Sequence, residues 1–102
     1  MIARIWHGIT MACKADQYLN CLNQLVLPDY RAANGNRGVY VFHWMQGELA
    51  HFLLLSLWAS RQELIAFAGP EPDKARQYPC EKQYLLAFES MAKHYEVLAE
   101  VE

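Results

Sequence analysis

The sequence predicts an α+β domain of the ferredoxin-like type, in which four antiparallel strands and two helices follow the order βαββαβ. Three observations support this fold class. A strand-like segment leads into an apolar helical stripe, two strand-like segments meet at a tight turn in mid-chain, and a capped second helix precedes an alternating C-terminal segment. This arrangement predicts the sheet order 4-1-3-2, with both helices on one face of the sheet.

The first strand is expected over residues 2–10, IARIWHGIT, which mix β-branched, aromatic and small side chains. A helix with one buried face should follow, because apolar residues recur there at helical spacing, namely Ala15, Tyr18, Leu19, Leu22, Leu25 and Val26. We expect Pro28 to end this helix. Residues 28–38, PDYRAANGNRG, should form a loop in which Gly35 and Gly38 adopt positive φ angles.

A β-hairpin is predicted next, from residues 39–45 and 48–58 joined near Gln46-Gly47. Ser60 stands three residues before Glu63, which is the spacing of a capping box, so a second helix should begin near Arg61. Gly69-Pro70 should end that helix.

The C-terminal third is expected to contain one helical turn beginning at Asp73 and another helix within residues 80–90 that packs Tyr84, Leu85 and Phe88. Residues 94–101, HYEVLAEV, alternate in polarity and should form the last strand. Because 54% of the 102 residues are hydrophobic, the chain can bury one core, and we expect a single domain over residues 1–102.

The third predicted strand has almost no polar face, since residues 51–58 read HFLLLSLW. The helices can cover only one side of it. An apolar sheet face left in water would exceed the patches that monomers normally expose. We therefore expect a second copy of the chain to cover the other side, giving a homodimer through the sheet face.

Composition excludes several classes of protein. Nine Lys and Arg are scattered among eleven Asp and Glu, with a net charge of −2, which argues against a nucleic-acid partner. No apolar run reaches the roughly 20 residues of a membrane span, and the N-terminus has no secretion signal, so a cytoplasmic protein is expected. Three cysteines without C-x-x-C spacing, at 13, 21 and 80, suggest reduced thiols.

Four segments carry a resemblance to a known family: IWHGIT, PDYRAANGNRGVYV, HFLLLSLWASRQEL and HYEVL. Together they make the chain similar to the antibiotic biosynthesis monooxygenase (ABM) family of the dimeric α+β barrel superfamily. The resemblance implies that two sheets meet face to face as a barrel, with a cavity between sheet and helices in each subunit. It covers nearly the whole chain and rests on strand and loop motifs, none of which is a catalytic signature.

The resemblance also implies an activity. We expect a monooxygenase that uses O2 without a cofactor to oxidise a small aromatic or phenolic compound, such as a quinol or a polyketide-like molecule. The alternative is a homodimer of the same fold that binds a small molecule, or is purely structural, without catalysis. Haem-degrading members use an Asn, a Trp and a His. The matching places here hold His7 or Trp6, then Phe67, then Gln77 or Tyr78, which counts against haem degradation.

Oxidation without a cofactor requires a base for the phenolic proton and a donor or cation for the resulting anion. His7 is a candidate base if its side chain, and not that of the neighbouring Trp6, points into the cavity. Tyr78 and Arg76 could hold the substrate oxygen. The plainer interpretation makes His7 a hydrogen-bonded core or interface residue, Arg76 a surface residue, and Tyr78 a packed ring.

Three aromatic side chains are candidates to line the substrate pocket, although residues at such places are more often core: Trp6, Trp58 and Phe67. His43 and His51 lie on the two arms of the predicted hairpin. With His7 they suggest a metal site, but no carboxylate or cysteine stands at ligand spacing beside them, so no metal is expected.

Overall fold

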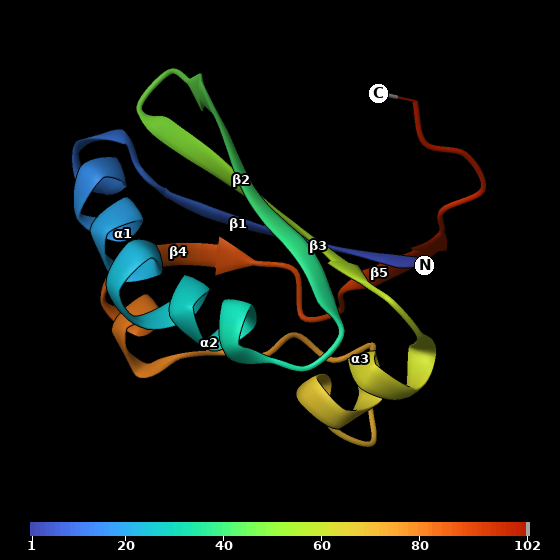
Figure 1. Ribbon diagram of the computed structural model, residues 1–102. Helices are drawn as coiled ribbons and strands as arrows, with labels where there is room; N and C mark the ends of the chain where they lie inside the picture. The colour runs from blue at the N-terminus through green and yellow to red at the C-terminus, as the bar shows by residue number, and fades with distance from the viewer. Residues whose placement is uncertain (102) are drawn as a thin grey trace.

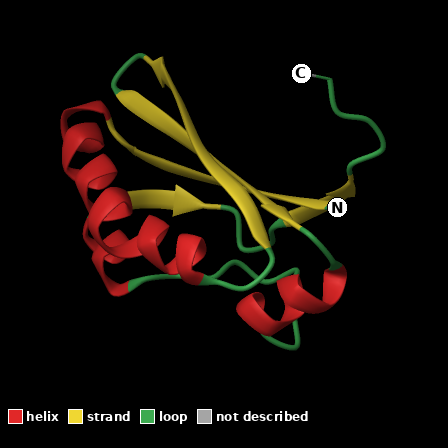
Figure 2. Cartoon of the chain, viewed as in Figure 1, coloured by secondary structure: helices red, strands yellow, loops and turns green. Residues whose placement is uncertain are grey.

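The computed structural model describes residues 1–101, in which one antiparallel sheet carries all its helices on a single face (Figures 1 and 2). In chain order the elements are β1 (Ile2–Met11), η1 (Ala12–Lys14), α1 (Ala15–Cys21), η2 (Leu22–Val26), α2 (Leu27–Ala32), β2 (Asn36–Gln46), β3 (Leu49–Trp58), α3 (Arg61–Ala68), η3 (Pro79–Gln83), β4 (Leu85–Phe88) and β5 (Lys93–Glu96). The predicted ferredoxin-like α+β class is confirmed.

The sheet has the order β2-β3-β1-β4, and β5 also pairs with β1. The expected order 4-1-3-2 is confirmed, because the C-terminal strand β5 pairs with the first strand, which lies beside the third. The prediction of a helix within residues 80–90 is wrong. That segment forms the short 3-10 helix η3 and then β4, which pairs with residues 8–10 of β1 while β5 pairs with residues 2–5. The edge of β1 opposite β3 is therefore hydrogen-bonded by β4 near one end and by β5 near the other.

The first helical segment is longer than expected, because Pro28 does not end it. The chain continues from α1 through the π-helical turn η2 into α2, with Pro28 in the first turn of α2. Proline is tolerated in a first turn, where its missing N–H would have no helical partner. The π turn also changes the buried face: Leu22 and Val26 are buried, while Leu19 and Leu25, which the helical spacing placed in the core, are exposed.

The hairpin and the second helix agree with the prediction. A two-residue turn, Gly47-Glu48, joins β2 to β3, and Gly47 has a φ of 59°. Ser60 caps α3 by accepting a hydrogen bond from the Glu63 backbone N–H at 3.3 Å. The loop before β2 is shorter than expected, and Gly35 there has a φ of 83° and lies against the Glu63 side chain, which leaves no room for a Cβ.

Alternate residues of β3 divide the sheet into two faces. Ala50, Phe52, Leu54, Ser56 and Trp58 are buried against the helices, whereas the residues between them are only half-buried. Core residues from α1, η2, α2 and α3 complete this helix-covered face, including Tyr18, Leu22, Val26, Tyr30 and Leu64. The opposite face, which we term the open face, has no element packed on it within the described chain.

The C-terminal third departs most from the prediction. No helical turn begins at Asp73; instead Lys74 forms a β-bridge with Met91. The last strand is limited to Lys93–Glu96, and residues 97–101 continue without regular structure. No helix within residues 1–101 is long and apolar enough to cross a membrane.

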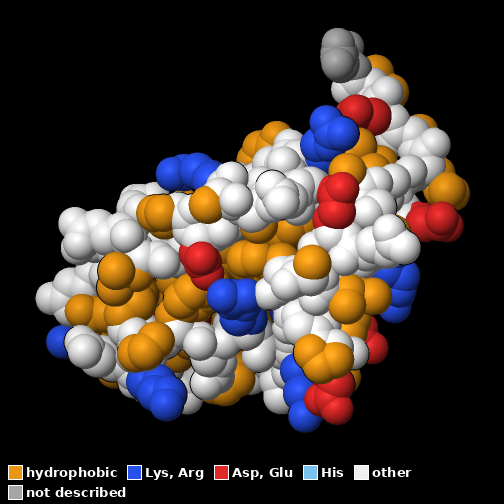
Figure 3. All heavy atoms as spheres, turned by 60° about the horizontal axis from the view of Figure 1, so that its bottom comes forward, with side chains coloured by type: hydrophobic (Ala, Val, Ile, Leu, Met, Phe, Trp, Pro, Cys, Tyr) orange, Lys and Arg blue, Asp and Glu red, His pale blue; other side chains and the backbone are white. Residues whose placement is uncertain are grey.

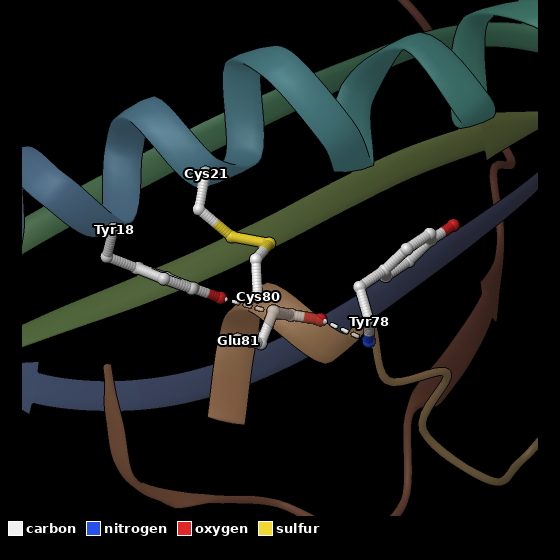
Figure 4. Close-up of a disulfide and its surroundings, with 5 residues drawn as sticks. All are labelled: Tyr18, Cys21, Tyr78, Cys80 and Glu81. Atoms are coloured by element: carbon white, nitrogen blue, oxygen red, sulfur yellow. Dashed lines mark hydrogen bonds between the residues drawn. A yellow bond between two sulfur atoms is a disulfide. The ribbon is translucent and has the colours of Figure 1, made fainter. Parts of the chain in front are cut away.

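The expectation of three reduced thiols is wrong. Cys21 at the end of α1 and Cys80 in η3 form a disulfide at a sequence separation of 59 (Figure 4). Cys13 is free and exposed. Sequence spacing could not reveal this pair, because the two cysteines meet only in the folded chain. A disulfide is typical of oxidising compartments. The cytoplasmic location therefore stays a prediction, and this bond argues against it.

The disulfide should stabilise the fold substantially, because it closes a long loop in the unfolded chain. We expect Cys80→Ser, or reduction of the wild type, to lower the free energy of unfolding by roughly 4 kcal/mol. Urea unfolding with and without reductant measures the difference. Cys13→Ser is the matched control and should leave the unfolding midpoint unchanged. Equal midpoints for wild type and Cys80→Ser would show that the bond contributes nothing.

Candidate functional site

Trp6 and His7 point to opposite faces of the sheet, as neighbours on a strand must. Trp6 is buried among the helices, and its indole N–H donates to the Glu89 carbonyl at 3.0 Å. His7 lies on the open face, opposite Leu53 of β3. The candidate base of the sequence analysis is therefore not in a cavity between sheet and helices.

On the open face His7 belongs to a chain of hydrogen bonds. Its Nε2 lies 2.9 Å from His51 Nδ1, and its Nδ1 lies 3.3 Å from a Glu89 oxygen. His51 Nε2 continues the chain to Gln46 Oε1 at 2.7 Å, and the Trp44 ring stacks on His51. The plainer interpretation of His7, a hydrogen-bonded histidine, describes this arrangement. No group of three or more His, Cys, Asp or Glu residues within positions 1–101 is arranged to hold a metal ion.

A pocket lies on the helix side, between α2 and α3. It has a volume of about 610 Å³, which is within the range of small-molecule sites. Residues of α2, its following loop and α3 line it together with one residue of the next segment: Asp29, Ala32, Ala33, Asn34, Gln62, Glu63, Ala66, Phe67 and Arg76. Figure 3 brings this side of the molecule forward and shows hydrophobic side chains among charged ones.

Arg76 and Tyr78 meet at one carboxylate on the pocket wall. Arg76 donates to Asp29 Oδ2 at 2.9 Å, and the Tyr78 hydroxyl donates to the same oxygen at 2.6 Å. The Arg76 guanidinium also donates to the Phe67 carbonyl and lies 4.3 Å from the centre of the Phe67 ring. Arg76 is thus fixed in place by three contacts, and is not the freely solvated residue of the plainer interpretation.

The Tyr78 hydroxyl is held in its neutral form. Burial raises the pKa of Tyr78, and the hydrogen bond to Asp29 raises it further, while the nearby Arg76 lowers it. Because the phenol donates its proton to Asp29, Tyr78 acts as a hydrogen-bond donor at neutral pH and does not serve as a base.

The three aromatic candidates for the pocket lining, Trp6, Trp58 and Phe67, differ in their positions in the structure. Phe67 lines the pocket, and its ring centre lies 4.9 Å from that of Trp58 and 4.8 Å from that of Tyr30. Trp58 is fully buried behind Phe67, and its indole N–H donates to the Ser56 hydroxyl at 3.0 Å. Trp6 is core as well. Only Phe67 of the three has the position expected of a substrate-lining residue.

Two further buried charged residues, Glu81 and Arg4, form hydrogen bonds within the core. Glu81 is buried beside the disulfide, where it accepts from the Tyr18 hydroxyl at 2.6 Å and from the Tyr78 backbone N–H at 3.1 Å (Figure 4). Burial raises the pKa of Glu81. Arg4 of β1 is also buried and donates to the Tyr30 hydroxyl at 3.4 Å.

The sequence analysis missed Asp29, Glu81 and Arg4. Asp29 follows Pro28, where the helix was expected to have ended, so no helical face was assigned to it. Arg4 could have been predicted to lie on the helix-covered face, because alternation along β1 puts it on the same face as Trp6. Glu81 lies in a polar segment and carries no signal, because its partners are distant in sequence.

Comparison with known structures identifies the fold. Over 97% of this chain and 100% of the other, the structure matches a protein of Nitrosomonas europaea assigned as an antibiotic biosynthesis monooxygenase, with a TM-score of 0.69 and 12% identity. A Bacillus cereus protein with the same assignment matches over 99% of this chain and 94% of its own, with a TM-score of 0.68 and 8% identity. The chain has the fold of the antibiotic biosynthesis monooxygenases.

A third structure with this monooxygenase fold is MhuD, the haem degrader of Mycobacterium tuberculosis, with two haems bound in its active site. It covers 100% of both chains, with a TM-score of 0.58 and 18% identity. No protein-family model matches the sequence, and no curated protein matches it. At these identities the likeness establishes the fold, and the activity must be argued from the site of this chain.

The contact between Tyr78 and Asp29 can be tested by titration. We expect Asp29→Ala to lower the pKa of Tyr78, because it removes the carboxylate that accepts the phenolic proton, and Arg76→Gln to raise it, because it removes a nearby cation. NMR of labelled tyrosine ring carbons follows the ionisation, with Tyr78→Phe assigning the signal. A Tyr78 pKa that is the same in all three proteins would contradict the contact.

Proposed function

We propose that the chain is a homodimeric monooxygenase that oxidises a small phenolic compound with O2, and that the pocket between α2 and α3 is its substrate site. The observation that carries this proposal is the joining of Phe67, Arg76 and Tyr78 around Asp29 at a pocket of about 610 Å³. The ABM fold of the chain supports it.

The pocket presents an aromatic ring and a cation, which are the groups that bind an electron-rich aromatic ligand. Phe67 presents a ring for stacking. Arg76 has five N–H donors, and among residues 1–101 they are engaged only by Asp29 and the Phe67 carbonyl, so others remain for a phenolate oxygen. Holding the substrate as its anion raises its reactivity with oxygen, and an arginine on the wall of the pocket favours that anion.

Oxygen uptake with a panel of quinols and phenols tests the activity. We expect the wild type to consume O2 and Arg76→Gln to reduce the rate roughly tenfold or more, because a charged hydrogen bond to the anion is lost. Tyr78→Phe should lower the rate less, because it removes only the hydrogen bond that helps to hold Asp29 in place. His7→Ala, on the other face of the sheet, should retain the uptake. No uptake with any compound would reject the monooxygenase.

The homodimer is supported by the open face of the sheet. Tyr40, Phe42 and Trp44 of β2 are 53%, 46% and 46% exposed and lie beside Leu55, Leu53 and His51 of β3 in register. A monomer seldom exposes a continuous apolar area of this kind. A second copy that packs its open face against this one would remove both open faces from water, because a two-fold interface pairs a surface with itself.

Substitutions on adjacent residues of β3 distinguish the two faces. Leu53→Asp should yield a folded monomer, because Leu53 lies on the open face, whereas Phe52→Asp should unfold the chain, because Phe52 is buried under the helices. Sedimentation equilibrium and circular dichroism measure the two outcomes. Leu98→Asp, at a residue 90% exposed, is the matched control and should remain a dimer. A dimeric Leu53→Asp would show that the open face is not the interface.

The alternative function is a homodimer that binds a small molecule, or is structural, without catalysis. Trp6 and Trp58 fill the space between sheet and helices, and the one histidine expected to act as a base lies outside it. Binding of phenols at the pocket without oxygen uptake would favour this alternative.

A further inference from the structure

Glu63 lines the pocket between α2 and α3 and has a carboxylate oxygen without a partner. Only one half of the predicted capping box forms in the described chain. The Ser60 hydroxyl accepts from the Glu63 backbone N–H, while Glu63 Oε2 is buried and has no hydrogen-bond partner. Leaving a buried acceptor unpaired is costly, so this carboxylate is suited to a ligand that donates hydrogen bonds.

The loop before β2 determines where the carboxylate lies. A Cβ at Gly35 would overlap the Glu63 carboxyl group, so the glycine leaves the space that this group occupies. Asn34, the residue before Gly35, lines the pocket together with Glu63. The carboxylate is therefore packed between this loop and α3, at the wall of the pocket.

The charges around the pocket do not balance. Its charged lining residues are Asp29, Glu63 and Arg76. Arg76 pairs with Asp29 at 2.9 Å, so these two charges compensate each other. Glu63 takes part in none of the ion pairs between residues 1 and 101. Because a cleft with an excess of one charge attracts ions of the opposite sign, the group that this pocket lacks is a cation.

The helix places Glu63 within reach of a ligand that contacts Arg76. Glu63 and Phe67 are four residues apart on α3, so their side chains are neighbours on one face of the helix. The Arg76 guanidinium lies 4.3 Å from the centre of the Phe67 ring. The pocket wall thus presents the guanidinium at Phe67 and the carboxylate about one helical turn, ~5.4 Å, nearer the start of α3.

We propose that the pocket binds a phenolic amine, whose protonated amino group donates to the Glu63 carboxylate while its phenolic oxygen lies at Arg76. This inference rests on the proposed function, for which it names the substrate class. The ammonium group supplies both the positive charge and the hydrogen-bond donors that Glu63 lacks. A phenol without an amino group leaves the carboxylate unpartnered, and a phenol that ends in a carboxylate brings a like charge towards it.

The test compares three ligands that share a phenol ring and differ in the group on its para side chain: tyramine, 4-ethylphenol and 3-(4-hydroxyphenyl)propanoate. Isothermal titration calorimetry at neutral pH measures their dissociation constants for the wild-type protein. We expect tyramine to bind roughly tenfold or more tightly than 4-ethylphenol, because it gains a charged hydrogen bond. The propanoate should bind most weakly of the three.

A single substitution tests whether Glu63 causes the preference. Glu63→Gln keeps the size of the side chain and removes its charge, so tyramine should then bind about as weakly as 4-ethylphenol. The binding of 4-ethylphenol itself should change little. Glu48→Gln is the matched control, because Glu48 is exposed in the turn between β2 and β3, at the other end of β3 from α3 (Figure 1). This variant should keep the preference for tyramine.

Two results would overturn the inference. One is a preference for tyramine that persists in Glu63→Gln. The other is wild-type protein that binds tyramine no more tightly than 4-ethylphenol, including the case in which it binds neither. The second comparison uses only the wild-type protein, so it does not depend on the folding of a variant.

Oxygen uptake separates this inference from the proposed function. Uptake with phenols, without tighter binding of tyramine, keeps the monooxygenase and rejects the phenolic amine as its substrate class. A preference for tyramine that depends on Glu63, without uptake of oxygen with any phenol, keeps the amine site and rejects the monooxygenase.

Discussion

The apolar character of both faces of β3 is the constraint on which the rest of the structure depends. Its alternate residues from Ala50 to Trp58 are closed in by the helices, and the residues between them, such as Leu53 and Leu55, are apolar too. Burying apolar surface contributes about 25 cal/mol per Å², so an apolar open face favours a partner of like shape. The same sequence pattern thus places the core and, through register, assigns a face to every paired residue of β1 and β2.

The pocket depends on long-range links, because the segment after α3 has little regular structure of its own. The disulfide from Cys21 to Cys80 fixes η3 to α1, and the buried Glu81 adds bonds to Tyr18 and to the backbone of Tyr78. The salt bridge and hydrogen bond to Asp29 then fix Arg76 and Tyr78 against α2. The site is therefore assembled by contacts between the two halves of the chain.

Local patterns predicted the elements whose causes are local. Alternation, the Gly47 turn and the Ser60 cap each determine backbone geometry within a few residues, and these parts agree with the structure. The prediction failed where distant contacts decide: residues 85–88 form a strand that pairs with the edge of β1, and the cysteines pair at a sequence separation of 59. For the site, Phe67, Arg76 and Tyr78 were predicted together, but Asp29, which joins them, was not.

The face of the sheet on which a side chain lies limits the chemistry available to it. His7 and His94 are both histidines on strands that pair directly, yet one faces the open side and bonds to His51, while the other faces the helices. The pocket lies on the helix side, so a side chain of the open face does not line it. The register of β1 with β3 therefore places His7 away from the pocket that the sequence analysis expected it to serve.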